Sequence, residues 1–459
     1  MRLPVQHLLM LCLRTGLVFP VASLAGSPGL AVVEVLPPTD VSPSAVNVFA
    51  SPVFARGPHV FSIDVERPPG GIEENGTNLH TVVRHGVEDR AGRWTWTSTV
   101  LDQGTIDDPY HTQGSVALDR RGFVHVAYNM HNMPWQYAVS TEPLSIREFR
   151  FRGEPVSAEQ RALLKHENRT NFPRLGNAAI PGTQVTYPRF AVDRSGELYV
   201  TYRFALRPKR AWPARDLAGG VARYDVETER WQALGEPVRV TGDDADLLAG
   251  RREAEQYAFA YQPGWTPYLL RLCFDYDGAM HIAWTWREGG PGADTVRPSY
   301  ARVDAASRTV ARSDRRSIGM PIGIADAESI GSSGPKARFV AGISLASDQQ
   351  NRVYALLQPA DGLREIWRRE PGAATWTAMG PAPFGATELV ADASGSLWAF
   401  ASGLRLLQRP IRGSGDWQLA YQEDGWCYPK PFHDPSSRRV FIHLLSCDRR
   451  QVKVLAFRY

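Results

Sequence analysis

One short pattern recurs along the chain and constrains its fold more than any other feature. The pattern is Asp-x-x-Gly followed by alternating apolar residues that end in an aromatic. Full copies begin at Asp119, Asp193, Asp275 and Asp392, and looser copies begin at Asp348 and Asp434. Each copy predicts a tight turn, in which glycine supplies a positive φ, and then a strand whose side chains alternate between two faces. The chain is therefore expected to be a series of related hairpins.

The spacing of these copies predicts a β-propeller. The copies at 348, 392 and 434 start 44 and 42 residues apart, which matches the ~40–50-residue period of a propeller blade. Trp-containing segments between the turns are expected to form outer strands, and an early strand pair at 59–65 and 79–83 adds one more blade. The count is about seven. Since each blade leaves one face uncovered until a neighbour stacks on it, the blades must close into a ring, with a strand near 452–457 helping to seal it.

The earlier intervals between copies are 74, 82 and 73 residues long and must carry insertions. We place these insertions near 154–180 and 241–265 and expect short helices in them, at 154–166 and 245–259. The fold class is thus all-β, a propeller with short helical insertions. Insertions of this kind often carry function.

The first 25 residues have the pattern of a secretory signal peptide: a basic start, an apolar stretch and a small-x-small site ending at Gly26. A transmembrane helix needs ~20 apolar residues, and no such stretch follows. We therefore expect one propeller domain over 26–459, secreted or periplasmic, monomeric and not inserted in a membrane.

Composition excludes one class of partner. The net charge of +4 on 52 basic and 48 acidic residues is too balanced for nucleic-acid binding. Five of the basic residues are Lys and 47 are Arg, which fits either a GC-rich genome or recognition of carboxylate or sulfate by guanidinium groups. Cys427 and Cys447 fit either one disulfide or two separate thiols. No Cys or His spacing matches a zinc site, so a structural metal stays open but unsupported, and no cofactor is required.

Ionisable and aromatic residues gather beside two of the predicted hairpins. His111 and His131 bracket one turn–strand unit, and Tyr187 and Arg203 bracket the next. A hairpin places the residues that flank its two strands at the same end of a blade, so both pairs are expected to face one mouth of the ring, where propeller ligands bind. His125 and His281 lie within the strands and are interpreted as structural.

These residue types suit β-elimination at a uronic acid. Arg203 would neutralise the sugar carboxylate, which allows negative charge to develop when the C5 proton is removed. A base takes that proton and an acid protonates the departing O4. Tyr187, His111 and His131 are the candidates for these two roles, and a tyrosine base would need its pKa lowered by a nearby arginine.

The same segments resemble the BNR-repeat polysaccharide lyases of the ulvan-lyase type. The matching features are the His ahead of the first full turn, Tyr-Asn-Met-His-Asn-x-Pro at 128–134, Tyr-Pro-Arg-Phe at 187–190 and the Tyr-Arg at 202–203. The resemblance implies a seven-bladed propeller whose lyase centre is formed by His111, His131, Tyr187 and Arg203. It also implies an aromatic from a later blade near the substrate. The candidate substrate-binding residues are Tyr268, Tyr261, Arg287, Asn132 and Trp135.

The predicted function is therefore a secreted lyase that cleaves an acidic polysaccharide at a 1,4-linked uronate, in ulvan or another rhamnose–glucuronate polymer. Two alternatives stay open. One is a sialidase-like glycoside hydrolase, although the Ser-x-Asp-x-Gly-x-Thr-Trp boxes of such propellers are absent in strict form. The other is a noncatalytic carbohydrate-binding propeller. Neither endo nor exo cleavage is indicated by the sequence.

Overall fold

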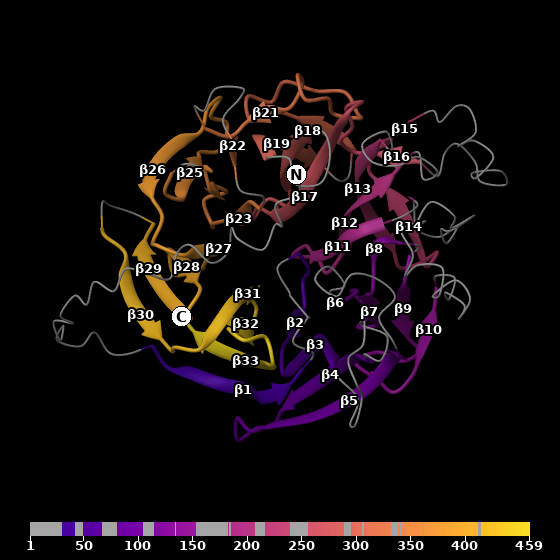
Figure 1. Cartoon of the computed structure of the whole chain (residues 1–459), viewed down its shortest axis with the longest axis vertical. Coiled ribbons are helices and arrows are strands. Elements are labelled where there is room, and N and C mark those ends of the chain that lie inside the picture. Colours follow the sequence, from indigo (N-terminus) through magenta and orange to yellow (C-terminus); the bar gives the residue numbers. More distant parts are fainter. Residues whose placement is uncertain are drawn as a thin grey trace, which may run out of the picture.

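The repeated hairpins form seven antiparallel sheets around a central axis in the computed structural model (Figure 1). The structure describes residues 30–41, 49–66, 80–103, 114–133, 135–152, 182, 185–206, 216–238, 256–288, 295–304, 307–331, 338–339, 342–360, 362–411 and 415–459. Within these ranges every regular element is a strand. The predicted all-β propeller of seven blades is confirmed.

The seven sheets share one plan, in which the chain runs outward from an innermost to an outermost strand. The strands of the first four are β2 (Val53–Arg56), β3 (His59–Glu66), β4 (His80–Glu88) and β5 (Trp94–Gln103); β6 (Ser115–Leu118), β7 (Val124–Ala127), β9 (Tyr137–Ser140) and β10 (Phe149–Phe151); β11 (Val185–Val192), β12 (Leu198–Ala205), β13 (Leu217–Asp225) and β14 (Arg230–Ala233); and β17 (Trp265–Phe274), β18 (Met280–Glu288), β19 (Thr295–Asp304) and β20 (Thr309–Ala311). The fifth and sixth are β23 (Ser344–Ser347), β24 (Val353–Leu357), β25 (Glu365–Arg369) and β26 (Thr377–Pro381); and β27 (Ala386–Ala391), β28 (Ser396–Ala401), β29 (Arg405–Pro410) and β30 (Gln418–Gln422).

The seventh sheet joins the two ends of the described chain. It contains β31 (Trp426–Asp434), β32 (Arg439–Ser446), β33 (Gln451–Arg458) and, as its outermost strand, β1 (Val32–Asp40). β1 runs antiparallel to β33, with Val32 opposite Phe457 and Asp40 opposite Gln451. The C-terminal strand therefore seals the ring as predicted, but its partner β1 was not anticipated from the sequence. Cys427 and Cys447 form a disulfide between β31 and the end of β32.

Five short strands lie outside this plan. They are β8 (His131–Met133), β15 (Glu236–Pro237), β16 (Tyr257–Ala258), β21 (Glu328–Ser329) and β22 (Arg338–Phe339). β8 leaves the second blade and pairs with the start of β11 in the third. The helix predicted over 245–259 is wrong at its described end, because β16 occupies Tyr257–Ala258 and pairs with β15. The helix predicted over 154–166 lies outside the described residues, as does the predicted signal peptide.

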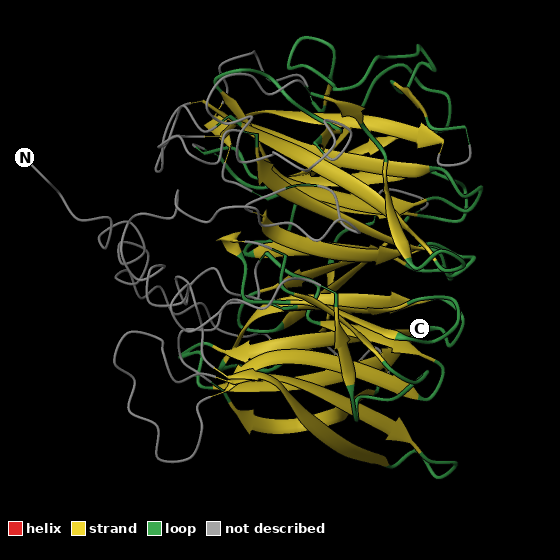
Figure 2. Ribbon diagram, turned by 90° about the vertical axis from the view of Figure 1, so that its right-hand side faces the viewer, coloured by secondary structure: helices red, strands yellow, loops and turns green. Residues whose placement is uncertain are grey.

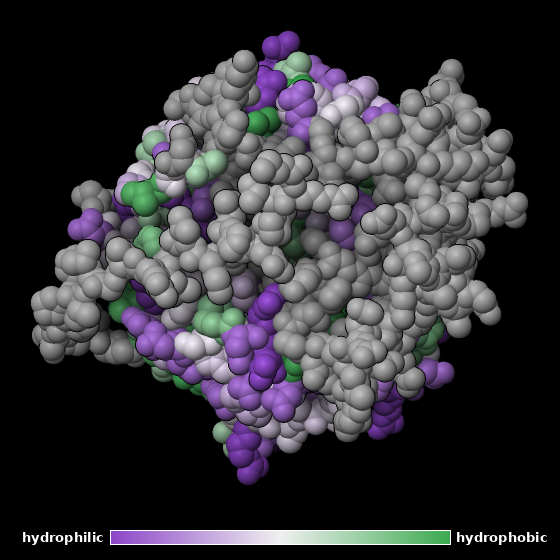
Figure 3. Space-filling model, in the orientation of Figure 1, coloured by the Kyte–Doolittle hydropathy of each residue, from purple (hydrophilic) through white to green (hydrophobic). Residues whose placement is uncertain are grey.

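The propeller has two distinct faces, which Figure 2 shows edge-on. The turn face carries the hairpins that join the first strand of each blade to the second and the third to the fourth. The loop face carries the connections from the second strand to the third and from each blade to the next; it is the face seen in Figure 1. In space-filling view the described outer edge of the loop face is largely hydrophilic (purple) over β1 and β5 (Figure 3). In the described chain no helix is long and apolar enough to cross a membrane.

The Asp-x-x-Gly turns all lie on the turn face and are built alike. In the copy at Asp275, N of Gly278 donates to the carbonyl of Asp275 (3.2 Å), N of Ala279 donates to Oδ1 (2.7 Å), and Gly278 has a φ of +83°. Oδ2 lies 3.0 Å from Nε2 of His281, whose Nδ1 lies 2.6 Å from the hydroxyl of Tyr300. The repeated Asp thus fixes both its own turn and the second strand six residues later, and the structural role predicted for His281 is confirmed.

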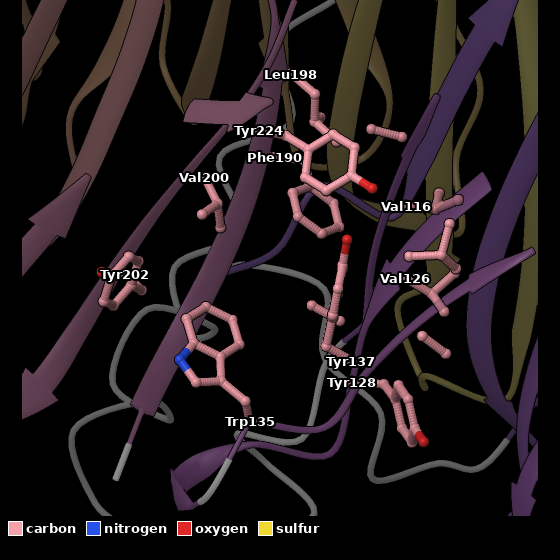
Figure 4. Close-up of a cluster of buried hydrophobic side chains, with 14 of the residues drawn as sticks. Val116, Val126, Tyr128, Trp135, Tyr137, Phe190, Leu198, Val200, Tyr202 and Tyr224 are labelled. Carbon is pink, nitrogen blue, oxygen red and sulfur yellow. The ribbon is translucent and has the colours of Figure 1, made fainter. Parts of the chain in front are cut away.

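Large side chains fill the spaces between neighbouring blades. Figure 4 shows this packing between the second and third blades, with Tyr137 from β9 and Phe190 from β11 among the buried rings. His125 lies in the same layer, fully buried and 2.6 Å from the Tyr137 hydroxyl, so its predicted structural role is also confirmed. Truncating one such ring to alanine typically costs about 3–5 kcal/mol, because the rigid neighbours cannot close the cavity. The blades therefore provide a stiff support for residues at their ends.

A candidate catalytic site at the loop face

Four side chains from the third and fourth blades meet where their inner strands reach the loop face. Tyr187 lies at the start of β11 and Arg203 near the end of β12, and Thr186 pairs with Arg203 across these strands. Tyr268 lies in the first half of β17, opposite Thr285, and Arg287 lies near the end of β18, opposite Thr266. The inner strands of adjacent blades start at the same level, so these two pairs of residues lie close together at the loop face. The sequence predicted this placement for Tyr187 and Arg203.

The aromatic and guanidinium groups of this cluster are stacked on one another. The hydroxyls of Tyr187 and Tyr268 lie 3.4 Å apart, and their rings meet edge to face with centroids 5.8 Å apart. Cζ of Arg203 lies 5.0 Å from the Tyr187 ring centroid and 5.6 Å from that of Tyr268. Arg287 stacks on the other ring of the pair, with Cζ 4.0 Å from the Tyr268 centroid. Two cations thus share two tyrosine rings.

Arg203 is buried, and its charge is not paired with any carboxylate of the described chain. Its Nη2 donates to Oδ1 of Asn132 over 3.5 Å, and its Nε has no hydrogen-bond partner among the described residues. Burial lowers the pKa of Arg203, while the two tyrosines oppose this; an arginine nevertheless stays protonated at neutral pH. A buried cation of this kind is suited to an anionic ligand.

β8 brings the second blade's contribution to the site. Backbone N of Asn132 donates to Oγ1 of Thr186 (2.8 Å), which in turn donates to Oδ1 of Asn132 (3.1 Å). This exchange anchors β8 on β11 and places the His131 ring beside Tyr187, with centroids 5.9 Å apart and planes tilted by 27°. His131 is half-buried, so its imidazole retains contact with solvent.

Two residues of the site have a backbone conformation that side chains other than glycine seldom adopt. Asn132 and Tyr187 both have a φ of 58°, and Tyr187 lies within the register shift between Thr186 and Arg189. Left-handed conformations at such residues cost of order 1–3 kcal/mol and concentrate at functional sites. In Tyr187 this conformation turns the ring toward Arg203 and Tyr268 instead of continuing the strand alternation.

The protonation of Tyr187 differs from the expectation for a base. Burial raises the pKa of Tyr187 well above the usual value and the nearby Tyr268 raises it further, whereas Arg203 and Arg287 lower it by less. The expected lowering by arginine is therefore present but is outweighed by desolvation. Tyr187 holds its proton at neutral pH and is suited to donate it.

The remaining candidates are placed as follows. Trp135 is only 1% exposed and meets Tyr202 edge to face at 5.0 Å, so the prediction that it binds substrate is wrong: its ring is part of the core in Figure 4. Tyr261 packs against the same core after β16. His111 lies outside the described residues. Phe49, which sequence reasoning missed, packs on Tyr187 with ring centroids 4.5 Å apart.

Family membership rests on the sequence of the blades. A model of the BNR repeat-containing family matches residues 76–379, which include all the described residues of the cluster. The chain belongs to the BNR repeat-containing family. No curated protein sequence matches it significantly. Within the described residues no three His, Cys, Asp or Glu side chains gather as a metal site would require.

Solved structures similar to this BNR repeat protein include polysaccharide lyases. The polysaccharide lyase Uly1 aligns with a TM-score of 0.62 at 14% identity, over 89% of this chain and 90% of that one. An ulvan lyase of family PL25, bound to -[GlcA(1-4)Rha3S]-, aligns with a TM-score of 0.60 at 9% identity, over 92% and 95% of the two chains. At these identities the similarity establishes the shared propeller fold.

Proposed function

We propose that this protein is a polysaccharide lyase that cleaves an acidic polysaccharide by β-elimination at a 1,4-linked uronate. The observation that carries the proposal is the buried guanidinium of Arg203, which lies beside a protonated tyrosine and a histidine and lacks a described carboxylate partner. A uronate carboxylate is a planar anion that a guanidinium can bind through two parallel hydrogen bonds. The structural neighbours that are lyases support the same reaction class.

In this mechanism Arg203 binds the C6 carboxylate of the uronate and neutralises it. The C5 proton then becomes removable, because the charge that develops on the carboxylate as the C5–H bond breaks is stabilised. The electron pair of that bond forms the C4=C5 double bond, and the C4–O bond breaks. The departing O4 receives a proton, so the products are a new hydroxyl end and an unsaturated uronate.

We assign the two proton transfers from the surroundings of Tyr187 and His131. Tyr187, whose pKa is raised by burial, is the acid that protonates O4. His131, half-buried beside it, is the described residue suited to take the C5 proton through a neutral imidazole. Tyr268 orients the Tyr187 hydroxyl at 3.4 Å, and Arg287 holds the Tyr268 ring. His111 stays a predicted member of the site.

A sialidase-like hydrolase is less compatible with this arrangement. Such an enzyme needs a carboxylate that activates its tyrosine nucleophile. Among the described residues, the groups that act on the pKa of Tyr187 are instead Tyr268, Arg203 and Arg287, none of which is a carboxylate. Among the described residues, the site is therefore equipped to donate a proton from tyrosine and not to remove one from it.

The test is a panel of acidic polysaccharides that includes ulvan, gum arabic and bacterial exopolysaccharides. A lyase produces the ultraviolet absorbance of the C4=C5 double bond and fragments whose masses sum to that of the polymer without added water. Saturated fragments carrying one added water per cleavage would identify a hydrolase, and binding without cleavage on every polymer would identify a noncatalytic propeller.

A further inference from the structure

A small apolar patch flanked by two arginines lies on the loop face, at the boundary between the fifth and sixth blades. The residues of this patch are Leu363, Arg364, Phe384 and Arg405. Phe384 is 80% exposed and Leu363 is 67% exposed, the two highest values among the large hydrophobic side chains of the described chain. Single exposed hydrophobic residues are common on protein surfaces, but exposed ones that adjoin and are rimmed by polar groups indicate a contact surface.

The strand register brings the two apolar residues of the patch together. Leu363 lies in the connection from β24 to β25, and Phe384 lies in the connection from β26 to β27. N of Ala382 donates to the carbonyl of Arg364 (2.7 Å), one step beyond the last paired residues of β25 and β26. The segments that carry Leu363 and Phe384 therefore continue this strand pair onto the loop face. Figure 3 shows hydrophobic (green) atoms there, between the positions of β26 and β29 in Figure 1.

The backbone beneath the Phe384 ring is held in place. Nη2 of Arg405 donates to the carbonyl of Phe384 (2.9 Å), and Cζ of Arg405 lies 5.9 Å from the centroid of the Phe384 ring. The next residue, Gly385, has a φ of +81°, and N of Ser402 donates to its carbonyl (3.4 Å). The loop is thus tied to the sixth blade while the ring itself stays exposed. A ring presented in this way can pack against a ligand at little cost in ordering the loop.

The two arginines give the patch a positive charge. Nε of Arg364 donates to Oε1 of Gln358 (2.9 Å), and burial lowers the pKa of Arg364, although an arginine stays protonated at neutral pH. The acidic neighbour Glu365 accepts a hydrogen bond from the indole of Trp367 (3.1 Å). Among the described residues, neither Arg364 nor Arg405 forms an ion pair with a carboxylate. Both are half-buried, so each guanidinium retains contact with solvent and can pair with an external anion.

We propose that this patch binds the acidic polysaccharide itself, as an accessory site separate from the catalytic cluster. The apolar C–H face of a sugar ring packs on Phe384 and Leu363, and a uronate carboxylate pairs with Arg405 or Arg364. The identity of the ligand rests on the proposed function. Because the patch and the catalytic cluster share the loop face, a polymer chain held at the patch stays on the side of the molecule where cleavage takes place.

The patch is too small for a stable protein interface but fits one or two sugar units. A specific protein–protein contact buries about 800 Å² on each partner. Four side chains supply much less than this, and the two arginines favour an anionic ligand over an apolar protein surface. A polymer gains affinity at such a small site because many repeat units of one chain can occupy it in turn.

The test is affinity electrophoresis in native gels that contain ulvan or gum arabic, with dextran gels as the neutral comparison. The reference protein and all variants carry Arg203→Met, so the polymer is not cleaved during the run. Phe384→Ser should weaken binding about fivefold or more, because the apolar contact with the sugar is lost. Phe384→Tyr keeps the aromatic face and should bind within about twofold of the reference. Arg405→Gln should also weaken binding, and the loss of affinity with added salt should become less steep.

Phe151→Ser is the matched control, because Phe151 is also an exposed phenylalanine, at 51%, but lies on β10 at the outer edge of the second blade; it should leave binding unchanged. The proposal is overturned if neither acidic polymer retards the reference protein, if Phe384→Ser and Phe151→Ser are retarded equally, or if dextran retards the reference as strongly. Dimers of the reference protein that Phe384→Ser dissociates in sedimentation velocity would also overturn it, since the patch would then be a protein interface. Because the readout is binding, a polymer that the wild type binds but never cleaves would contradict the proposed function and leave this inference standing.

Discussion

Replacing Arg203 by methionine separates its chemical role from its structural one. Methionine fills similar volume but removes the charge and the planar fork. The lost attraction to the Tyr187 and Tyr268 rings, at 5.0 and 5.6 Å, is worth about 0.5–2 kcal/mol per ring. That loss is partly offset because a charge no longer has to be buried. The free energy of unfolding should therefore change by less than about 2 kcal/mol.

The effect on catalysis should be much larger. Losing the group that neutralises the uronate carboxylate should lower kcat/KM about 10³-fold, or about 4 kcal/mol of transition-state stabilisation. The assay is initial rate by ultraviolet absorbance of the double bond, with urea unfolding on the same preparations. Arg369→Met is the control, because Arg369 is also buried and stacks on a tyrosine, with Cζ 5.2 Å from the Tyr300 centroid, but lies in the fifth blade. An Arg203→Met enzyme with wild-type turnover, or one that loses only as much activity as the control, would refute the assignment.

Tyr187→Phe keeps the ring packing but removes the proposed acid, so kcat should fall about 10²–10⁴-fold with little change in thermal midpoint; a fully active variant would contradict the role. Because burial raises the pKa of Tyr187, the wild-type pH–rate profile should show no alkaline loss from this group below about pH 10, and a lower alkaline limb that disappears in Tyr187→Phe would argue against it. Burial opposes ionisation of Glu388, but Lys430 and two arginines outweigh it and lower the pKa below the ordinary value of 4.5. The stabilisation from the ionised Glu388 carboxylate is therefore complete above pH 4.5 and is lost as the pH falls below that value. Urea midpoints measured against pH, for the wild type and for Glu388→Gln, will show this loss. Replacing Cys427 and Cys447 by serine opens a bridge between residues 20 apart and should cost about 3 kcal/mol in urea unfolding; reduction of the wild type should have the same effect, and equal stability of all three would contradict it.

The closed ring of blades and the placement of Tyr187 beside Arg203 could be predicted from the sequence, because both follow from the regular spacing of the hairpins. The Asp-x-x-Gly turns set the ends of the inner strands, so residues flanking a hairpin, such as Tyr187 and Arg203, had to share one end of a blade. The same logic correctly interpreted His281 as structural, since it lies six residues after a turn Asp and inside a strand.

What could not be predicted depends on contacts that periodicity does not encode. Trp135 follows a segment rich in ionisable and aromatic residues, which suggested a place in the site. The chain turns into β9 at this point, however, and the Trp135 ring lies between two blades. The net effect on the pKa of Tyr187 depends on how deeply the ring is buried, which spacing alone does not reveal. β1 contains two prolines at positions 37 and 38 and pairs with a strand more than four hundred residues away, so it lacks the local signature of a strand. Four inner strands carry a charged residue directly after a register shift, namely Arg189, Arg271, Glu388 and Lys430. This pattern becomes visible in the sequence only after the four strands are aligned.

The pairing of β1 with β33 has a consequence for how the molecule is made. The side chains of Gln451 and Asp40, which hydrogen-bond across this seam, are separated by 411 positions. During synthesis β1 must stay unpaired until the final segment leaves the ribosome, and until then the first blade lacks its neighbour on one side. Folding should therefore be slow and cooperative at its last step. In a circularly permuted chain whose new termini lie between β29 and β30, β1 follows β33 directly, so the two strands can pair as soon as both have been synthesised.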